Sequence, residues 1–252
     1  MTLHMRTSSG EEDKMDTRTA VVTGCSRGIG AAIANRLRLC AYSVIEIQRT
    51  SSHVPADLGQ WQKAPDTWAR AMKLAPHGVD LLVLNAGASC DGTFVEAEPD
   101  DVTRCFDLNV FGALMLAREA LRYWTAAHRP GHIVMIGSQA ALPGAGEANV
   151  LYAASKGAMH AAMGPLAREY GPLIRVNCIA PGDVATDTER ALVARGRGND
   201  AEPESAWREV AARSALGRWV QADEIADAVL FLERCAAMTG AILNVSCGTS
   251  IH

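Results

Sequence analysis

The chain has 252 residues, of which 48% are hydrophobic, and its formal net charge at pH 7 is −4. A chain of this length can form one large core, so two domains are not required. The negative charge argues against a nucleic-acid-binding protein that works through a strongly basic surface. No apolar run reaches membrane-spanning length, which argues against a membrane protein.

The amino-terminal segment and the cysteines indicate the compartment. Residues 1–16 are polar and charged and lack the apolar stretch of a secretory signal, so we expect a flexible leader outside the fold. The seven cysteines are scattered, without a CxxC pair or the spacing of metal ligands, so no metal site is expected. Reduced thiols in a cytoplasmic protein are the simplest interpretation.

From Thr19 onward, β-prone runs alternate with stretches of helical periodicity. The predicted strands are Thr19–Thr23, Ser43–Ile47, Asp80–Leu84, His132–Ile136, Ile174–Ile179 and Ala241–Val245. The clearest predicted helices are Gly30–Leu39, Val102–Ala127, Tyr152–Tyr170 and Asp223–Arg234. This alternation predicts an α/β fold, a doubly wound parallel sheet in a single domain over residues 17–252. The polar, arginine-rich segment at 187–217 interrupts the pattern and is interpreted as an inserted lid.

The first strand leads into a glycine-rich turn, Thr23-Gly24-Cys25-Ser26-Arg27-Gly28-Ile29-Gly30. Glycine permits a tight turn and lets the backbone approach a pyrophosphate closely. The helix that follows offers free N–H groups and the positive end of its dipole. The pattern therefore indicates a phosphate-binding turn, with a ligand-free strand–helix turn as the alternative.

The end of the second strand bears on which dinucleotide would bind. A carboxylate at this tip would accept a hydrogen bond from the ribose 2′-hydroxyl of NAD, whereas a basic residue suits the 2′-phosphate of NADP. The strand ends in Gln48 and Arg49, and Arg27 in the turn offers a second guanidinium. NADP is favoured, with two solvated surface arginines as the alternative. Glu46 shares the strand face of Gln48 and keeps NAD open.

A tyrosine and a lysine lie one turn apart at the start of a predicted helix, in Tyr152-Ala-Ala-Ser-Lys156. A tyrosine hydroxyl is a poor base at neutral pH, and a neighbouring ammonium favours its phenolate form. Ser138 follows a buried strand, at the edge where parallel sheets bind their ligands. Only four of the 24 basic residues are lysines, and one follows this tyrosine. A surface pair is the alternative for the tyrosine and lysine taken alone.

Together these motifs resemble the short-chain dehydrogenase/reductase family, whose fold is a Rossmann-type sheet. The resemblance extends from Thr19 to about Gly248. It places the catalytic residues at Asn109, Ser138, Tyr152 and Lys156. It places the cofactor contacts at Gly24, Ser26, Arg27, Gly28, Ile29, Gly30, Arg49, Asp57, Leu58, Asn85, Ala86, Gly87, Tyr152, Lys156, Pro181, Gly182, Val184 and Thr186.

The resemblance implies an NADP(H)-dependent enzyme that interconverts a small carbonyl compound and its alcohol. Tyr152 would exchange the proton, Ser138 would bind the substrate oxygen, Lys156 would bind the nicotinamide ribose, and Asn109 would support a water chain. It also implies a homodimer or homotetramer. An NAD-dependent alcohol dehydrogenase and a non-catalytic cofactor-sensing protein are the alternatives. The helix that many relatives insert between Arg49 and Asp57 is absent here, and His160 is expected to pack or to lie in an interface.

Overall fold

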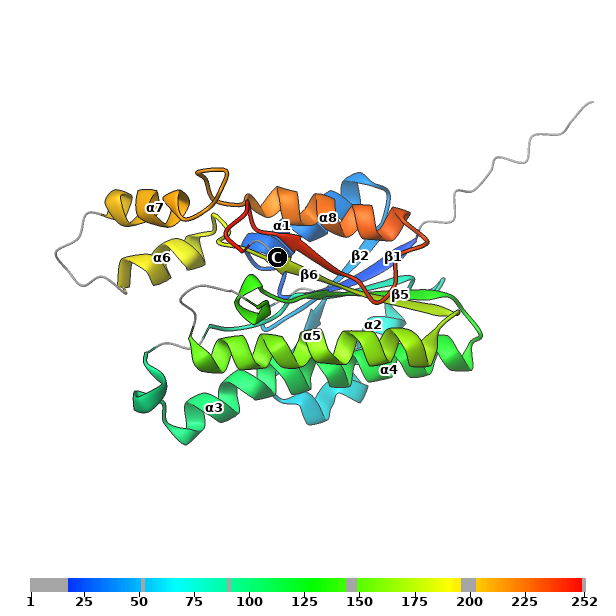
Figure 1. The fold of residues 1–252 in the computed structure, drawn as a ribbon. Helices are drawn as coiled ribbons and strands as arrows, with labels where there is room; N and C mark the ends of the chain where they lie inside the picture. Colours follow the sequence, from blue (N-terminus) through cyan, green and yellow to red (C-terminus); the bar gives the residue numbers. More distant parts are fainter. Residues whose placement is uncertain (1–17, 51–52, 90–91, 144–148, 196–202, 251–252) are drawn as a thin grey trace, which may run out of the picture.

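The structure is a computed structural model that describes residues 18–50, 53–89, 92–143, 149–195 and 203–250 (Figure 1). The expected leader at residues 1–16 lies outside the described residues. No helix in the described ranges is long and apolar enough to cross a membrane.

The described residues form a seven-stranded sheet in the order β3-β2-β1-β4-β5-β6-β7, and every neighbouring pair is parallel. The strands are β1 (Thr19–Thr23), β2 (Ser43–Gln48), β3 (Val54–Pro55), β4 (Leu81–Leu84), β5 (Gly131–Ile136), β6 (Ile174–Pro181) and β7 (Ile242–Val245). The predicted Rossmann-type, doubly wound sheet in a single domain is therefore confirmed. Chain order reverses between β1 and β4, and ligands of such sheets bind beyond the carboxyl ends of the strands at this point.

Helices cover both faces of the sheet (Figure 1). Helices α1 (Gly28–Leu39) and α8 (Ala222–Arg234) lie on one face. Helices α2 (Ala64–Lys73), α4 (Ala113–Ala126) and α5 (Val150–Tyr170) lie on the other. The segment expected as a lid contains α6 (Asp187–Arg195) and α7 (Pro203–Ala212), which extend beyond the sheet.

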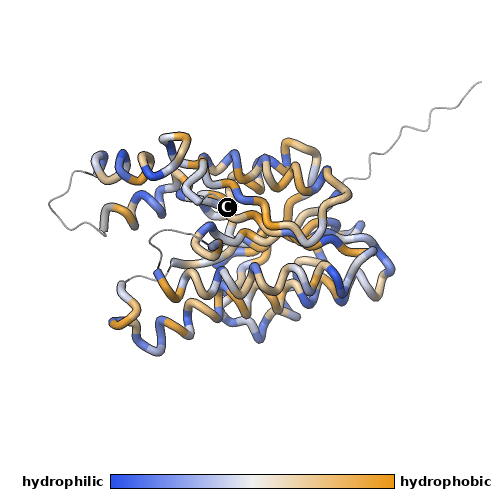
Figure 2. The backbone as a smooth tube through the Cα atoms, viewed as in Figure 1, coloured by the Kyte–Doolittle hydropathy of each residue, from blue (hydrophilic) through white to orange (hydrophobic). Residues whose placement is uncertain are grey.

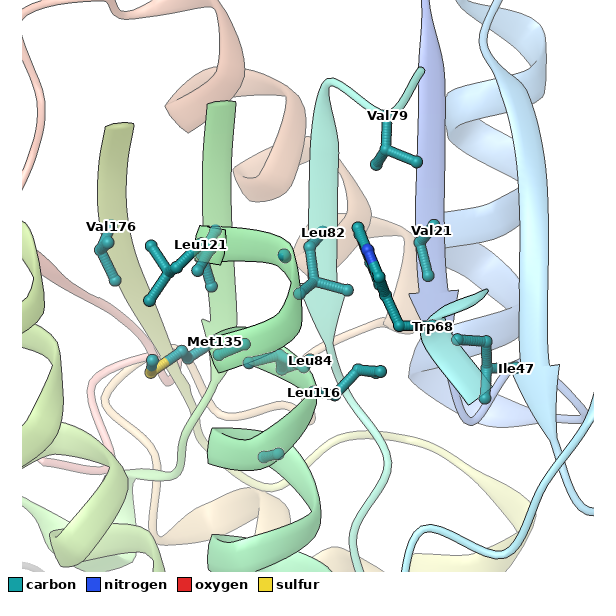
Figure 3. Packing of buried hydrophobic residues seen from close by; sticks show 14 of the residues in the cluster. Val21, Ile47, Trp68, Val79, Leu82, Leu84, Leu116, Leu121, Met135 and Val176 are labelled. Atoms are coloured by element: carbon teal, nitrogen blue, oxygen red, sulfur yellow. The ribbon is translucent and has the colours of Figure 1, made fainter. Parts of the chain in front are cut away.

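Side-chain alternation along the strands produces two cores. Val21 of β1 belongs to the core beneath α2, α4 and α5, whereas its neighbours Ala20 and Val22 belong to the core beneath α1 and α8. Figure 3 shows Trp68 of α2 close to Val21 and Leu82 in the first core. Because both faces are covered, the central strands are largely apolar, and all four residues of β4 are buried hydrophobic side chains (Figure 2).

The helix expected at Val102–Ala127 is divided. Helix α3 (Pro99–Phe106) begins earlier, with proline in its first turn and a capping box between Glu98 and Asp101. A π-helical segment, η3 (Asp107–Gly112), then separates α3 from α4. At Gly112 a side-chain carbon would lie 2.3 Å from the carbonyl oxygen of Leu58, so the wide turn also brings two backbones together. Strand β3 and helix α2 were not predicted.

A buried polar network joins β5, β6 and α8 at the amino edge of the sheet. Nδ1 of His132 lies 2.6 Å from Oε2 of Glu233, and Asn177 lies 3.1 Å from the other ring nitrogen. Burial lowers the pKa of His132, and so does the charge of Arg175, against the opposing effect of Glu233. Burial acts to raise the pKa of Glu233, but the hydrogen bonds from His132 and Tyr42 outweigh it, so this pKa is lowered. Neutral His132 therefore donates from Nδ1 to the carboxylate.

We expect Glu233→Gln to lower the free energy of unfolding at pH 7 by about 3 kcal/mol, because it removes one partner of a buried charged network. Urea unfolding measures this change. The loss should shrink below pH 4.5, the ordinary carboxyl value, since the stabilisation from a lowered pKa disappears as the carboxylate is protonated. Asp227→Asn is the control on the same helix: its exposed pair with Arg36 should contribute less than about 1 kcal/mol. Equal losses in the two variants would contradict the role of the network.

Candidate active site

The glycine turn joins β1 to α1 at the carboxyl edge of the sheet. Gly24 and Gly28 have φ values of +70° and +58°, which favour glycine. At Gly30 a side-chain carbon would lie 2.1 Å from the carbonyl oxygen of Gly24, so no other residue fits there. Helix α1 has no side-chain cap and no acidic residue in its first turn. Its amino end is therefore suited to an anion.

Asn85, predicted to contact the cofactor, holds this turn in place. Its side-chain amide donates to the carbonyl oxygens of Thr23 and Gly24, each at 3.0 Å. The Thr23 hydroxyl accepts from the backbone N–H groups of Asn85 and Ala86, each at 2.9 Å. The Asn85-Ala86-Gly87 run is thereby fixed against the turn across the β1–β4 switch point.

Residues at the tip of β2 and in the glycine turn bear on cofactor choice. Arg27 and Arg49 are both exposed, and neither has an ion-pair partner within the described ranges. The carboxylate of Glu46 instead pairs with Arg38 of α1. Sequence reasoning did not single out Gln48, whose buried Oε1 has no hydrogen-bond partner among the described residues.

The remaining predicted cofactor residues occupy two places on the same edge. Asp57 is exposed after β3 and accepts from the N–H of Gly59 at 3.0 Å, while Leu58 is buried. On the other side, Pro181 ends β6, and the chain that leaves the strand contains Gly182, Val184 and Thr186. A side-chain carbon at Gly28 would lie 3.2 Å from Cγ2 of Thr186, so this segment faces the glycine turn.

Tyr152 and Lys156 lie in the first turns of α5. Asn149, just before the helix, accepts from the backbone N–H groups of Leu151 and Tyr152 at 3.0 and 3.1 Å and caps it. Lys156 is buried, and its Nζ donates to the carbonyl oxygen of Ile136 at 2.9 Å. The same Nζ lies 5.7 Å from the centre of the Tyr152 ring. Two of the three ammonium N–H groups thus remain for other partners.

Ser138 stands immediately beyond β5, where the chain enters the short helix η4 (Gln139–Ala141). Its Oγ accepts from the N–H of Ala140 at 3.1 Å, so the hydroxyl proton is left to donate elsewhere. The end of β5 therefore carries both the carbonyl that binds Lys156 and the serine.

Asn109 projects from the π-helical segment and ties β4 to α5. Its amide exchanges two hydrogen bonds of 2.9 Å with the backbone of Ala88 and donates to Oγ of Ser155 at 3.0 Å. A side-chain carbon at Gly87 would lie 3.1 Å from Oδ1 of Asn109 and 3.3 Å from Nζ of Lys156. Asn109 and Lys156 thus border one space, which Gly87 leaves open. Sequence reasoning missed Ser155, although its position beside Lys156 in the motif was a signal.

Two half-buried carboxyl groups beyond the end of β6 were also missed. Burial raises the pKa of Asp183, against the effects of Arg213 and of a hydrogen bond from Gln139. Burial and the charge of Asp183 raise the pKa of Glu189. Gln139 follows Ser138 directly in the chain, so the Asp183 carboxyl contacts the residue next to the serine.

The residues present fit a dinucleotide. The uncapped end of α1 suits a pyrophosphate. The exposed guanidinium groups of Arg27 and Arg49 suit a ribose that carries a phosphate, and the two remaining donors of Lys156 suit a second ribose. Within the described ranges, no group of three or more His, Cys, Asp or Glu residues is placed to hold a metal ion.

Comparison with known proteins identifies close similarity over most of the chain. Residues 18–196 match the family model described as short chain dehydrogenase. D-erythrulose reductase of Gallus gallus is 30% identical, over 92% of this chain and 95% of that protein. L-rhamnose 1-dehydrogenase (NAD(P)(+)) of a Sphingomonas species is 27% identical, over 94% and 98%. The structure of a 3-oxoacyl (acyl-carrier-protein) reductase from Agrobacterium tumefaciens with NADP bound superimposes with a TM-score of 0.81, at 31% identity over 92% and 93%.

We expect Gly30→Ala to weaken both the fold and the dinucleotide site, because its methyl group would overlap the Gly24 carbonyl. Such overpacking is unfavourable by about 1–3 kcal/mol. Urea unfolding and titration of NADPH fluorescence measure the two effects. The matched control is Gly164→Ala in α5, where a methyl group meets no described atom within 4 Å and should stabilise the helix by about 0.5–1 kcal/mol. Wild-type NADPH binding by Gly30→Ala would refute the role of this turn.

Proposed function

The chain belongs to the short-chain dehydrogenase/reductase family and is an oxidoreductase of the carbonyl/alcohol class, and on that premise we propose that it uses NADP(H), with Tyr152 as general acid and base. The observation that carries the proposal is that Tyr152 and a buried Lys156 lie on one turn of α5, with the Lys156 ammonium bonded to Ile136, the last residue of β5 and two residues before Ser138.

When bound, NADP(H) supplies or accepts the hydride at its nicotinamide ring. Ser138 donates its hydroxyl proton in a hydrogen bond to the substrate oxygen. Tyr152 transfers its phenolic proton to that oxygen during reduction and takes it back during oxidation. Lys156 favours the phenolate form of the tyrosine through its charge and offers its two remaining N–H groups to ribose hydroxyls. Asn109 borders the space beside Lys156, which supports its predicted place in a water chain.

NADP(H) is proposed over NAD(H) from the charges at the adenosine end. Arg49 and Arg27 are exposed and available to a 2′-phosphate. The nearby carboxylate of Glu46 is engaged by Arg38, which weakens it as an acceptor for the NAD ribose. An NAD-dependent alcohol dehydrogenase is the second candidate, because one relative's name includes both cofactors.

A non-catalytic cofactor sensor on the same fold is the third candidate. Such a protein needs no serine, tyrosine and lysine at one edge of the sheet. Their common placement favours an enzyme.

The proposal extends to assembly and compartment. We propose a homodimer or homotetramer, by analogy with the family, and a cytoplasmic location, to which the free cysteines of the described residues are suited. The lid role of residues 187–217, the domain limits at 17–252 and the leader stay predictions.

Tyr152→Phe should lower kcat for carbonyl reduction by about 10²–10⁴-fold, because the phenolic proton is lost. The assay follows NADPH oxidation at 340 nm with 2,3-butanedione, ethyl acetoacetate and D-erythrulose as a panel of carbonyl compounds. NADPH affinity should be retained. Tyr170→Phe, at the far end of the same helix, is the control and should retain wild-type turnover. Undiminished turnover in Tyr152→Phe would exclude the acid/base role.

Arg49→Ala should weaken NADPH binding by roughly 10–100-fold, the loss of a hydrogen bond to a charged group. NADH binding should hardly change, since NADH lacks the 2′-phosphate. Fluorescence titration of both cofactors measures this difference, with the exposed Arg104→Ala on α3 as control. An equal loss for NADPH and NADH, or a wild-type preference for NADH, would contradict the cofactor assignment.

A further inference from the structure

His160 lies on α5, one turn beyond Lys156 and two turns beyond Tyr152. Its Nε2 lies 3.4 Å from the backbone nitrogen of Ser138. A side-chain carbon at Gly137 would lie only 2.1 Å from the same Nε2. The imidazole therefore packs directly against the main chain that leads from β5 into Ser138.

The contact defines which nitrogen of the neutral ring carries the proton. The Ser138 backbone group is an N–H donor, so Nε2 must accept and the ring proton must be on Nδ1. Nδ1 is buried and has no partner among the described residues. Burial lowers the pKa of His160, and the charge of Lys156 lowers it further.

The groups around the ring support a neutral imidazole. Lys156, on the same helix, is the cation that acts on it. From β6, Cys178 packs against Gly137, and burial raises the pKa of this thiol to about 11, so it carries no compensating negative charge. At neutral pH, His160 is thus an uncharged acceptor beside a buried ammonium.

We propose that His160 is a positioning residue, whose neutral imidazole holds the Gly137–Ser138 backbone and so aims the Ser138 hydroxyl at the substrate oxygen. This inference rests on the proposed reductase function. The serine is then held at two points: its N–H donates to His160, and its Oγ accepts from Ala140.

Acid should disrupt this arrangement. A protonated His160 presents an N–H donor to the Ser138 N–H donor and adds a second cation beside Lys156. Turnover should therefore fall as the pH falls below 6.5, the ordinary imidazole value, with a midpoint set by His160. Asp183 and Glu189 also titrate in acid, but they are unchanged in His160 variants, so comparison with wild type isolates the imidazole.

Two variants separate the role of the His160 ring as a hydrogen-bond acceptor from the effect of its charge when protonated. His160→Gln places an amide oxygen near the position of Nε2 and does not titrate, whereas His160→Leu fills the space without an acceptor. With the panel compound that wild type reduces fastest, His160→Leu should lower kcat at pH 7.5 by about tenfold, the equivalent of one hydrogen bond, and leave KM for NADPH unchanged. His160→Gln should retain kcat within about twofold and lose the acid limb of the pH profile.

A measurement without cofactor provides the second readout. In the NMR spectrum of the free protein, the ¹⁵N–H signal of Ser138 should titrate with the midpoint of the His160 ring in wild type and show no such step in His160→Gln. Circular dichroism at each pH establishes that the variants remain folded.

The outcomes distinguish this inference from the proposed function. No NADPH oxidation by wild type with any panel compound would refute the reductase function. Turnover by wild type together with an unchanged acid limb in His160→Gln would overturn the positioning role alone. A Ser138 amide signal that shows no step at the midpoint of the His160 titration would also overturn the positioning role.

Discussion

The buried ammonium of Lys156 is the constraint on which the proposed site depends. Only 5% of this residue is exposed, and a buried charge is strongly unfavourable unless it is hydrogen-bonded. The carbonyl of Ile136, the last residue of β5, supplies that bond. The start of α5 is thereby held at the carboxyl edge of the sheet. Ser138 follows the same strand two residues later, so the serine and the lysine lie at one edge of the sheet although they belong to different elements.

The two edges of the sheet differ in how completely their polar groups are satisfied. At the amino edge, the carboxylate of Glu233 accepts from His132 and Arg175, and Asn177 donates to the other ring nitrogen of His132, so these groups stabilise the fold. At the carboxyl edge, Gln48 and His160 each bury an atom that has no partner in the described part of the chain, and α1 begins without a side-chain cap. Unmet polar groups lower stability, but they are also what a polar ligand can bind. The division matches the place where sheets of this topology bind ligands.

Much of the fold and many candidate residues could be predicted from local patterns. Apolar runs such as Asp80–Leu84 identify strands covered on both faces, and their alternation with helices implies the parallel sheet. The glycine turn and the Tyr152–Lys156 spacing depend on neighbours in the chain, so they are visible in the sequence. Helix α2, strand β3 and the π-helical segment were missed. The π-helical segment in particular accompanies the contact of Gly112 with Leu58, which is distant in the chain.

The sequence by itself determined the α/β class, the alternation of strands with helices and the residue types available for chemistry, because these depend on local periodicity and spacing. Only the tertiary structure decided what each residue touches. Asn85 proved to lock the glycine turn, Glu46 to pair with Arg38, and His160 to lie against Ser138. Each contact joins two different elements, and it forms only once the fold has brought those elements together.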